Sequence, residues 1–446
     1  MGSDLLVRVG RPEDVLPALL PGGSVLLTQE EVTSEELGVD RRVRASLPEG
    51  VRWEYCWGST LFHRDDLPFR RDLRDAPDVF TVFKNAVEPE LAARVNEVPE
   101  TYQGGRRKAK STIKVRPCLP EPAKGSLPLP ALDPSELDFE PKWADLPYEA
   151  PVPQPWRPAR GSAAAAFEGG EEPGLERLKY YLWDSDSIKT YFETRNGMLG
   201  TDYSTKLSAW LALGCVSPRK VFEQVREYEK SRVANKSTYW VLFELMWRDF
   251  FRFFAAKHGD AIFREDGVSG RARAWEEDDA LFELWAAGRT GYPLVDASMR
   301  ELRETGYMSN RGRQNVASFL ALDMKLDWRR GADWFESLLV DYDVTANWGN
   351  WVHAAGLTTG RVNRFNVIKQ SKDYDAAGEY LRHWLPELKE VPAPKVHEPW
   401  LLTADERRRY GAEDYPRPCV DPSTFRQRSG GGGGGRGHLG PPGWEG

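Results

Sequence analysis

Several features that would assign this 446-residue chain to a common class of protein are scarce or missing. Only four cysteines are present (Cys56, Cys118, Cys215 and Cys419), and none forms a Cys-x-x-Cys pair. This argues against a disulfide scaffold or a zinc ribbon and favours a reducing compartment. No run of about 18 apolar residues occurs, so no segment is predicted to span a membrane. The N-terminal residues lack the basic segment and apolar run of a secretory signal.

Three catalytic motifs and an excess of positive charge are also missing. The sequence contains no Gly-x-x-x-x-Gly-Lys-[Ser/Thr], no His-Glu-x-x-His and no Gly-x-Ser-x-Gly. These absences argue against P-loop hydrolysis, zinc proteolysis and esterase chemistry. The formal net charge is −7. Because a protein that coats duplex DNA by charge alone would be basic overall, any contact with nucleic acid must come from a local patch.

Aromatic residues, in contrast, are abundant. The chain has 17 Trp, 16 Tyr and 19 Phe, and ten of the Trp lie between Trp183 and Trp351. Composition alone favours a large, well-packed helical core, because aromatic rings dominate core energetics. A site that uses indole rings for stacking or for electron transfer is the second interpretation.

The pattern along the chain predicts an α/β segment followed by an all-α domain. Residues 5–9, 24–28 and 51–55 read as short strands, and a helix begins near Pro12 with two acids in its first turn. Thirteen of the 32 prolines lie between 117 and 175, which indicates a linker. The predicted organisation is a partial α/β domain at 1–100, a linker at 101–175, a helical domain at 176–400 and a flexible Gly-rich tail at 401–446.

Polar clusters that interrupt the apolar helices are the candidate sites. Residues 203–208 combine three hydroxyls and a Lys at a helix start, which suits either phosphate groups or ordinary N-capping. Glu244 and Arg248 are four residues apart on a helix that is apolar nearly all round, which suits a buried salt bridge or a ligand. Residues 310–313 and 341–347 add acids, Arg and Asn that suit a polar heterocycle. A metal is the rival interpretation, but no second-ligand His accompanies these acids at a usable spacing.

These clusters, together with residues 194–198, 213–218, 237–244, 290–293 and 308–314, resemble the motifs of the photolyase/cryptochrome family, and of its cryptochrome DASH subgroup above all. The resemblance extends from about residue 5 to about residue 390 and is densest over 180–385. It implies an α/β plus all-α fold, with a partial Rossmann-like N-terminal domain, a long linker and a large helical FAD-binding domain. It also implies that the first strand and helix of the N-terminal domain are missing from this chain.

By position, the resemblance assigns residues to the flavin site and to electron transfer. Asn347 matches the position that faces the flavin N5, where an amide can adapt its hydrogen bond to a protonated nitrogen. Catalytic roles fall to Glu244, to Asn347 and to three indoles that pass an electron from the surface to photoexcited FAD, Trp351, Trp328 and Trp275. The cofactor-binding residues it implies are Tyr191, Ser204, Thr205, Lys206, Leu207, Ser208, Glu244, Arg248, Asn310, Arg313, Asp341, Asp343 and Asn347.

The resemblance also indicates nucleic-acid contacts. Glu244 and Trp247 resemble residues that meet a flipped cyclobutane pyrimidine dimer, and flipping requires less energy in a single strand. His353 stands where a Trp or Tyr usually helps to hold the dimer, which is a departure from the family. No metal site is predicted.

We therefore predict a monomeric, FAD-dependent blue-light protein with a 5,10-methenyltetrahydrofolate antenna. It is expected to show deoxyribodipyrimidine photolyase-type activity on single-stranded DNA, with RNA or looped duplex as further partners. The alternative is a blue-light photoreceptor and nucleic-acid-binding regulator with little or no repair activity, and a third interpretation is a helical scaffold without flavin. The expected location is intracellular, in a chloroplast or mitochondrion if a transit peptide precedes this sequence.

Overall fold

The computed structural model describes residues 8–88, 114–120, 167–360 and 362–425, which belong to two compact units. The first unit comprises Met1–Gly58 and Arg116–Arg157, and the second comprises Ser59–Val115 and Pro158–Gly446. Most of the predicted strand at 5–9 and most of the predicted linker at 101–175 lie outside the described residues.

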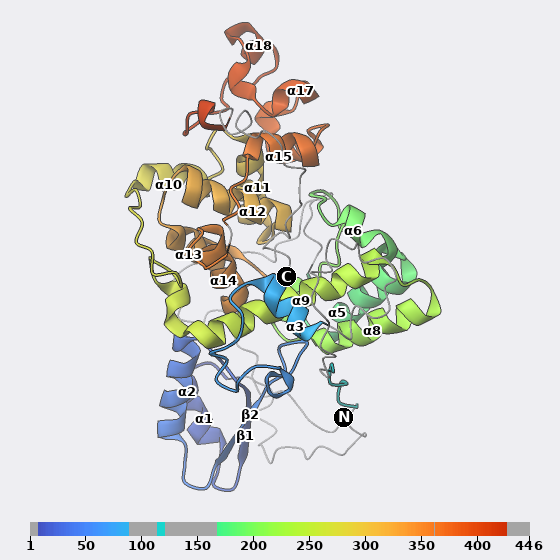
Figure 1. Cartoon of the computed structure of the whole chain (residues 1–446). Coiled ribbons are helices and arrows are strands. Elements are labelled where there is room, and N and C mark those ends of the chain that lie inside the picture. Colours follow the sequence, from blue (N-terminus) through green and yellow to red (C-terminus); the bar gives the residue numbers. More distant parts are fainter. Residues whose placement is uncertain (1–7, 89–113, 121–166, 361, 426–446) are drawn as a thin grey trace. The chain divides into compact units, whose positions relative to one another are not determined.

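The first unit contains a parallel βαβ arrangement. Strand β1 (Val25–Gln29) pairs with β2 (Arg52–Cys56) in parallel, with Val25 opposite Arg52, and α2 (Ser34–Ser46) supplies the crossover that parallel strands need. Helix α1 (Pro12–Leu19) begins with its proline and packs against α2 (Figure 1). Both strands predicted here are confirmed, each displaced by one residue. Two parallel strands are fewer than a doubly wound sheet requires, so a Rossmann-like domain stays a prediction.

The second unit is mainly helical. Besides short 3₁₀ segments, its helices are α3 (Phe80–Val87), α5 (Glu171–Lys179), π-helix η5 (Tyr180–Asp184), α6 (Tyr191–Thr194), α7 (Ser208–Ala212), α8 (Pro218–Ser231), α9 (Lys236–His258), α10 (Asp279–Ala286), α11 (Pro293–Thr305), α12 (Asn310–Ser318), π-helix η8 (Phe319–Asp323), α13 (Trp328–Leu338), α14 (Val344–Ala354), α15 (Val367–Tyr374), α16 (Glu379–Trp384), α17 (Ala393–Val396) and α18 (Ala404–Arg409). None of these described helices combines the length and apolar character needed to cross a bilayer.

Helix α9 is the centre of this unit. Asn235 and Thr238 form a capping box at its start, and Gly259 follows its last residue at a φ of 53°. The helix packs against α3, α6, α8 and α14 (Figure 1), and nearly all of its residues are buried. The prediction of a helix buried all round is confirmed.

The segment that follows the strands is attached to α9. The buried carboxylate of Asp249 accepts hydrogen bonds from the backbone N–H groups of Leu61 and Phe62, at 2.9 and 2.8 Å. Phe80 of α3 stacks on Trp247 with ring centroids 3.6 Å apart. Residues 59–88 therefore belong to the helical unit, whereas the sequence placed everything up to residue 100 in the α/β domain.

The C-terminal region is also more ordered than the predicted tail at 401–446. It forms α18, and the Tyr415 hydroxyl donates to the buried carboxylate of Asp296 at 2.6 Å. The Tyr292 hydroxyl donates to the carbonyl of Val420 at 2.8 Å, and Phe425 is only 1% exposed. Packing continues to residue 425 because these long-range contacts bury aromatic rings that the local pattern does not reveal. The Gly-rich run itself lies outside the described residues.

Candidate functional site

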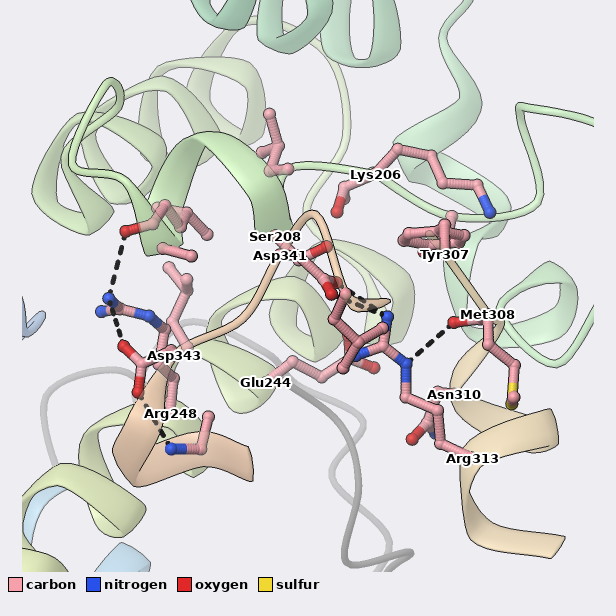
Figure 2. A pocket seen from close by; sticks show the side chains of 18 of the residues that line it. Lys206, Ser208, Glu244, Arg248, Tyr307, Met308, Asn310, Arg313, Asp341 and Asp343 are labelled. Atoms are coloured by element: carbon pink, nitrogen blue, oxygen red, sulfur yellow. Dashed lines mark hydrogen bonds and ion pairs between the residues drawn. The ribbon is translucent and has the colours of Figure 1, made fainter. Parts of the chain in front are cut away.

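One pocket of the helical unit brings the predicted cofactor residues together. It lies among the loop before α7, one face of α9, the start of α12 and the start of α14 (Figure 2). All thirteen residues that the resemblance assigned to the flavin site line it, although they come from widely separated parts of the chain. The lining also includes Arg195, Tyr203 and Met308, which lie in these motifs but were assigned no role, and Tyr307 and Asn350, which lie outside them. Asn350 follows Asn347 by about one helical turn, so the sequence alone could have predicted that the two side chains lie on the same face of the helix.

The loop before α7 is fixed by Arg177 of α5. The guanidinium donates to the carbonyls of Thr201, Ser204 and Thr205 at 2.8–3.0 Å, and it pairs with Asp202 at 3.1 Å. One cation thus holds three backbone carbonyls within residues 201–205, next to the pocket. Arg177 has no place among the predicted site residues, because nothing in its own helix marks it.

Lys206 occupies an unusual position in this loop. Its backbone φ is +59°, in the left-handed region that non-glycine residues seldom adopt, and the residue is 2% exposed. Its ammonium lies 3.6 Å from the ring centroid of Tyr203 and 4.5 Å from that of Tyr307 (Figure 2). Burial holds the pKa of Lys206 well below its usual value. The amine packs over these two rings in a site that disfavours its charged form, so the backbone of Lys206 is the better candidate for contact with a ligand.

Glu244 and Arg248 project from α9 toward the pocket. The Tyr191 hydroxyl donates to the Glu244 carboxylate. Arg248 donates to the carbonyl of Leu211 at 3.1 Å and lies 3.5 Å from the carboxylate of Asp343. The buried arginine is thus paired, as a charge removed from water must be.

Asp343 links this charge to the start of α14. Its carboxylate caps the helix by accepting from the Ala346 N–H at 2.9 Å, and it accepts from the Thr345 hydroxyl at 2.7 Å. Burial by itself would raise the pKa of Asp343, but the Arg248 charge and the Ala346 N–H hold it below its usual range. The carboxylate is therefore ionised at neutral pH and fixes both Arg248 and the first turn of α14.

A second ion pair joins α12 to the segment before α14. The Arg313 guanidinium donates to both carboxylate oxygens of Asp341, at 3.0 and 2.8 Å, and to the carbonyl of Met308 at 2.9 Å (Figure 2). Such two-point contacts fix the direction of the side chains as well as their distance. Arg248 and Arg313 thus form ion pairs with Asp343 and Asp341, two pairs that the sequence did not name, and all four residues line the pocket.

Three amide oxygens in the pocket lack hydrogen-bond donors among the described residues. The Asn347 Nδ2 donates to the carbonyl of Ala332 at 3.1 Å, which leaves its buried Oδ1 without a partner in this part of the chain. The Oδ1 atoms of Asn310 and Asn350 likewise have no hydrogen-bond donor among the described residues. An unsatisfied buried acceptor costs about 1–3 kcal/mol, so a ligand that donates N–H groups would stabilise the site.

The three predicted electron-transfer indoles lie on neighbouring elements. Trp351 is four residues after Asn347 on α14 and is fully buried, and its ring packs against Gly331 of α13. Trp328, also buried, begins α13 and donates to the carbonyl of Glu265 at 3.2 Å. Trp275 is only partly buried and precedes Glu276, whose β-bridge partner Leu326 is close to Trp328 in sequence. Burial thus decreases from Trp351 to Trp275.

Two of the predicted nucleic-acid contacts, Trp247 and His353, are not among the residues that line the pocket. Trp247 is 3% exposed beneath Phe80. His353 lies 3.4 Å from the Thr358 hydroxyl, and burial lowers its pKa to about 4, so the ring is neutral at pH 7. The sequence could not foresee that Phe80 covers Trp247, because the two residues are far apart along the chain.

Known proteins share both the sequence and the fold. Residues 240–430 match the family described as the FAD binding domain of DNA photolyase, and residues 1–101 match DNA photolyase. The chain is 49% identical to a chloroplastic/mitochondrial cryptochrome DASH of Ostreococcus tauri, over 95% of this chain and 77% of the relative. It is 46% identical to a cryptochrome DASH of Xenopus laevis, over 94% and 76%. A solved Synechocystis cryptochrome superposes with a TM-score of 0.81 at 45% identity, covering 96% of this chain and 84% of that one.

Proposed function

Because the chain belongs to the cryptochrome DASH subgroup of the photolyase/cryptochrome family and carries that family's FAD-binding domain, we propose that its pocket holds FAD for blue-light chemistry on nucleic acid. The proposed reaction is electron transfer from reduced FAD to a cyclobutane pyrimidine dimer in single-stranded DNA. The observation that carries the proposal is the convergence of all thirteen expected residues on one pocket.

The residues present fit a flavin dinucleotide. The unpartnered oxygens of Asn347 and Asn310 would accept hydrogen bonds from ligand N–H groups. The backbone around Lys206 would contact the diphosphate, while Arg248 and Arg313, already paired with Asp343 and Asp341, would hold the walls of the pocket in place. When bound, FAD supplies the light absorption and the one-electron chemistry, and the protein contributes orientation and electrostatics.

The proposed electron path uses Trp351, Trp328 and Trp275. Trp351 and Trp328 are both fully buried and Trp275 is partly exposed, which supports Trp275 as the surface end of the path. Buried indoles are also held rigidly, because Trp351 packs edge-on against Phe335 at 5.1 Å.

Glu244 is the proposed contact to the pyrimidine edge. It already accepts a hydrogen bond from Tyr191 within the pocket, so its carboxylate is oriented before substrate arrives. Trp247 would join this contact only after Phe80 moves from its ring, and His353 stays a proposed contact outside the pocket lining. The folate antenna, a Rossmann-like N-terminal domain, nucleic-acid binding and a monomeric state are further parts of the proposal.

The alternative, a photoreceptor that binds nucleic acid with little repair, is favoured by one observation. Trp247, the proposed aromatic contact to the dimer, is stacked beneath Phe80, and its indole Nε1 has no hydrogen-bond partner in the described chain. A substrate that needs this ring would first have to break an aromatic stack worth about 0.5–1.5 kcal/mol beyond its buried area.

A repair assay distinguishes these functions. A single-stranded oligonucleotide with one pyrimidine dimer is mixed with the purified flavoprotein, illuminated with blue light and analysed for restored pyrimidines. We expect repair by the wild type and a loss of at least tenfold in Glu244→Ala, because a charge-assisted hydrogen bond is worth about 1.5–3 kcal/mol. Glu223→Ala, on the partly exposed surface of α8, is the matched control.

Each other outcome has a distinct meaning. Protein that binds FAD and is photoreduced but leaves the dimer intact supports the photoreceptor. Protein that purifies without flavin, and takes up none when FAD is added, contradicts both functions and leaves the helical scaffold.

A further inference from the structure

A second hollow in the helical unit concentrates positive charge beside an indole. Arg273, Lys325 and Arg364 line it together with Trp275 and short apolar side chains, and it shares no lining residue with the flavin pocket. Neither the flavin site nor the proposed contact to a dimer uses these three cations.

Two of the three charges are not neutralised by a described acid. Arg273 donates through Nη1 to the carbonyl of Ala355 at 2.6 Å, a neutral acceptor, and its guanidinium carbon lies 5.8 Å from the ring centroid of Trp275. Lys325 makes no ion pair within the described part of the chain, while its backbone carbonyl accepts from the Glu276 N–H at 2.9 Å. Only Arg364 is paired, with Asp323 at 2.9 Å. The hollow therefore keeps a net positive charge.

Trp275 would add to the positive charge of the hollow when it is oxidised. It is the most exposed of the three proposed electron-transfer indoles, and its Nε1 has no hydrogen-bond partner among the described residues. After light-driven electron transfer the outermost indole would carry a positive charge beside Arg273. Like charges at this separation repel, so an anion that enters the hollow is attracted by the cations and by the oxidised ring together.

We propose that this hollow is the docking site of a small anionic one-electron donor, such as an ene-diolate or a thiolate, that returns an electron to oxidised Trp275. The inference rests on the proposed electron path. One electron passes from the anion to the indole radical cation, which restores neutral Trp275 and leaves the donor as a one-electron-oxidised radical. No bond forms or breaks in the protein. A thiolate gives up its electron without a proton, whereas an ene-diolate monoanion also releases its remaining hydroxyl proton to water.

The first test measures how fast oxidised Trp275 disappears after a flash, at increasing ascorbate concentrations, in the FAD-loaded protein. Arg273→Gln and Lys325→Gln should each lower the bimolecular rate constant by about two- to fivefold at low salt, with the effect vanishing near 1 M salt, where charges are screened within about 3 Å. Lys389→Gln, an exposed charge outside the hollow, should match the wild type. Hydroquinone, which is uncharged at pH 7, should react equally with every variant. Equal ascorbate rates in all variants would overturn the proposal.

A second test examines the hollow without electron transfer. The fluorescence of Trp275 is measured in the dark as the emission that is lost in Trp275→Phe. Quenching of this emission by the anion iodide is then compared with quenching by neutral acrylamide. Arg273→Gln should weaken iodide quenching about two- to fivefold and leave acrylamide quenching unchanged. Identical iodide quenching would show that no anion is attracted and would overturn the site.

The two experiments also separate this inference from the proposed electron path. If Trp275→Phe photoreduces FAD at the wild-type rate, the path through Trp275 is wrong and the donor role is overturned, whatever the iodide result. If a short oligothymidine competes with ascorbate at low salt, the hollow binds a nucleic-acid backbone, and the assignment to a small donor is overturned.

Discussion

Replacing Gly331 with Ala tests whether packing around Trp351 is as tight as the structure indicates. A Cβ at position 331 would lie 2.3 Å from the Trp351 ring, whereas ordinary contacts begin near 3.4 Å, so the ring or the backbone of α13 must move by about 1 Å. The indole has little room to move, because Phe335 and Trp285 lie 5.1 and 6.1 Å from its centroid. Overpacking costs about 1–3 kcal/mol, and the better helix propensity of Ala returns up to about 1 kcal/mol.

We therefore expect Gly331→Ala to lose about 1–2 kcal/mol of unfolding free energy. With a urea dependence near 3 kcal/mol per molar, the unfolding midpoint of the FAD-loaded protein should fall by about 0.5 M. Gly38→Ala in α2 is the matched control, because its Cβ would meet only the flexible ends of Arg42 and Arg41, at 3.5 and 3.9 Å. A Gly331→Ala protein that unfolds at the wild-type urea concentration, with an unchanged rate of flavin photoreduction, would refute this packing argument.

Two other substitutions test the buried charges and the electron path. Glu301 accepts from the Tyr380 hydroxyl at 2.7 Å, and burial raises its pKa from 4.5 to about 7. The folded protein then holds a proton that the unfolded chain releases between these pH values, so wild-type stability falls as pH rises from 4.5 to 7. Between pH 5 and pH 8 the wild type should lose up to about 3 kcal/mol of unfolding free energy, as measured by denaturation, and Glu301→Gln should not show this loss. Equal losses in both proteins would argue against the raised pKa. Trp351→Phe should retain FAD and slow its photoreduction, as measured by transient absorption, because Phe keeps most of the ring volume and removes the easily oxidised indole. An unchanged rate would redirect the path to Trp348, whose ring lies 5.8 Å from that of Trp328.

The sequence predicted those features of the fold and the pocket that depend on neighbouring residues. The period of apolar residues identified α9 as buried, and the short motifs at 203–208 and 341–347 identified parts of one pocket. Contacts between distant residues left no such signal. Asp249 follows Arg248 on a helix that is apolar nearly all round, and nothing local indicates that its carboxylate accepts backbone N–H groups 188 and 187 residues earlier.

Phe80 is a second residue whose long-range contact could not be predicted from the sequence around it. Nothing in the residues around Phe80 indicates its partner, and only the folded chain shows the ring against Trp247. Lys206 is a third example, since a lysine in a phosphate-binding motif suggests a side-chain contact. The left-handed backbone and the two tyrosine rings direct that side chain elsewhere.

The attachment of residues 59–88 to α9 decides where the chain can be divided. A fragment that begins in the proline-rich stretch would keep Asp249 buried but remove the backbone N–H groups of Leu61 and Phe62. A buried acceptor left without its donors costs about 1–3 kcal/mol, so that fragment would lose a substantial part of the usual 5–15 kcal/mol of net stability. The aromatic surface of α9 that Phe80 covers would face water as well. A self-sufficient flavin-binding fragment should therefore start no later than Ser59, well before the segment that the sequence suggests as the boundary between domains.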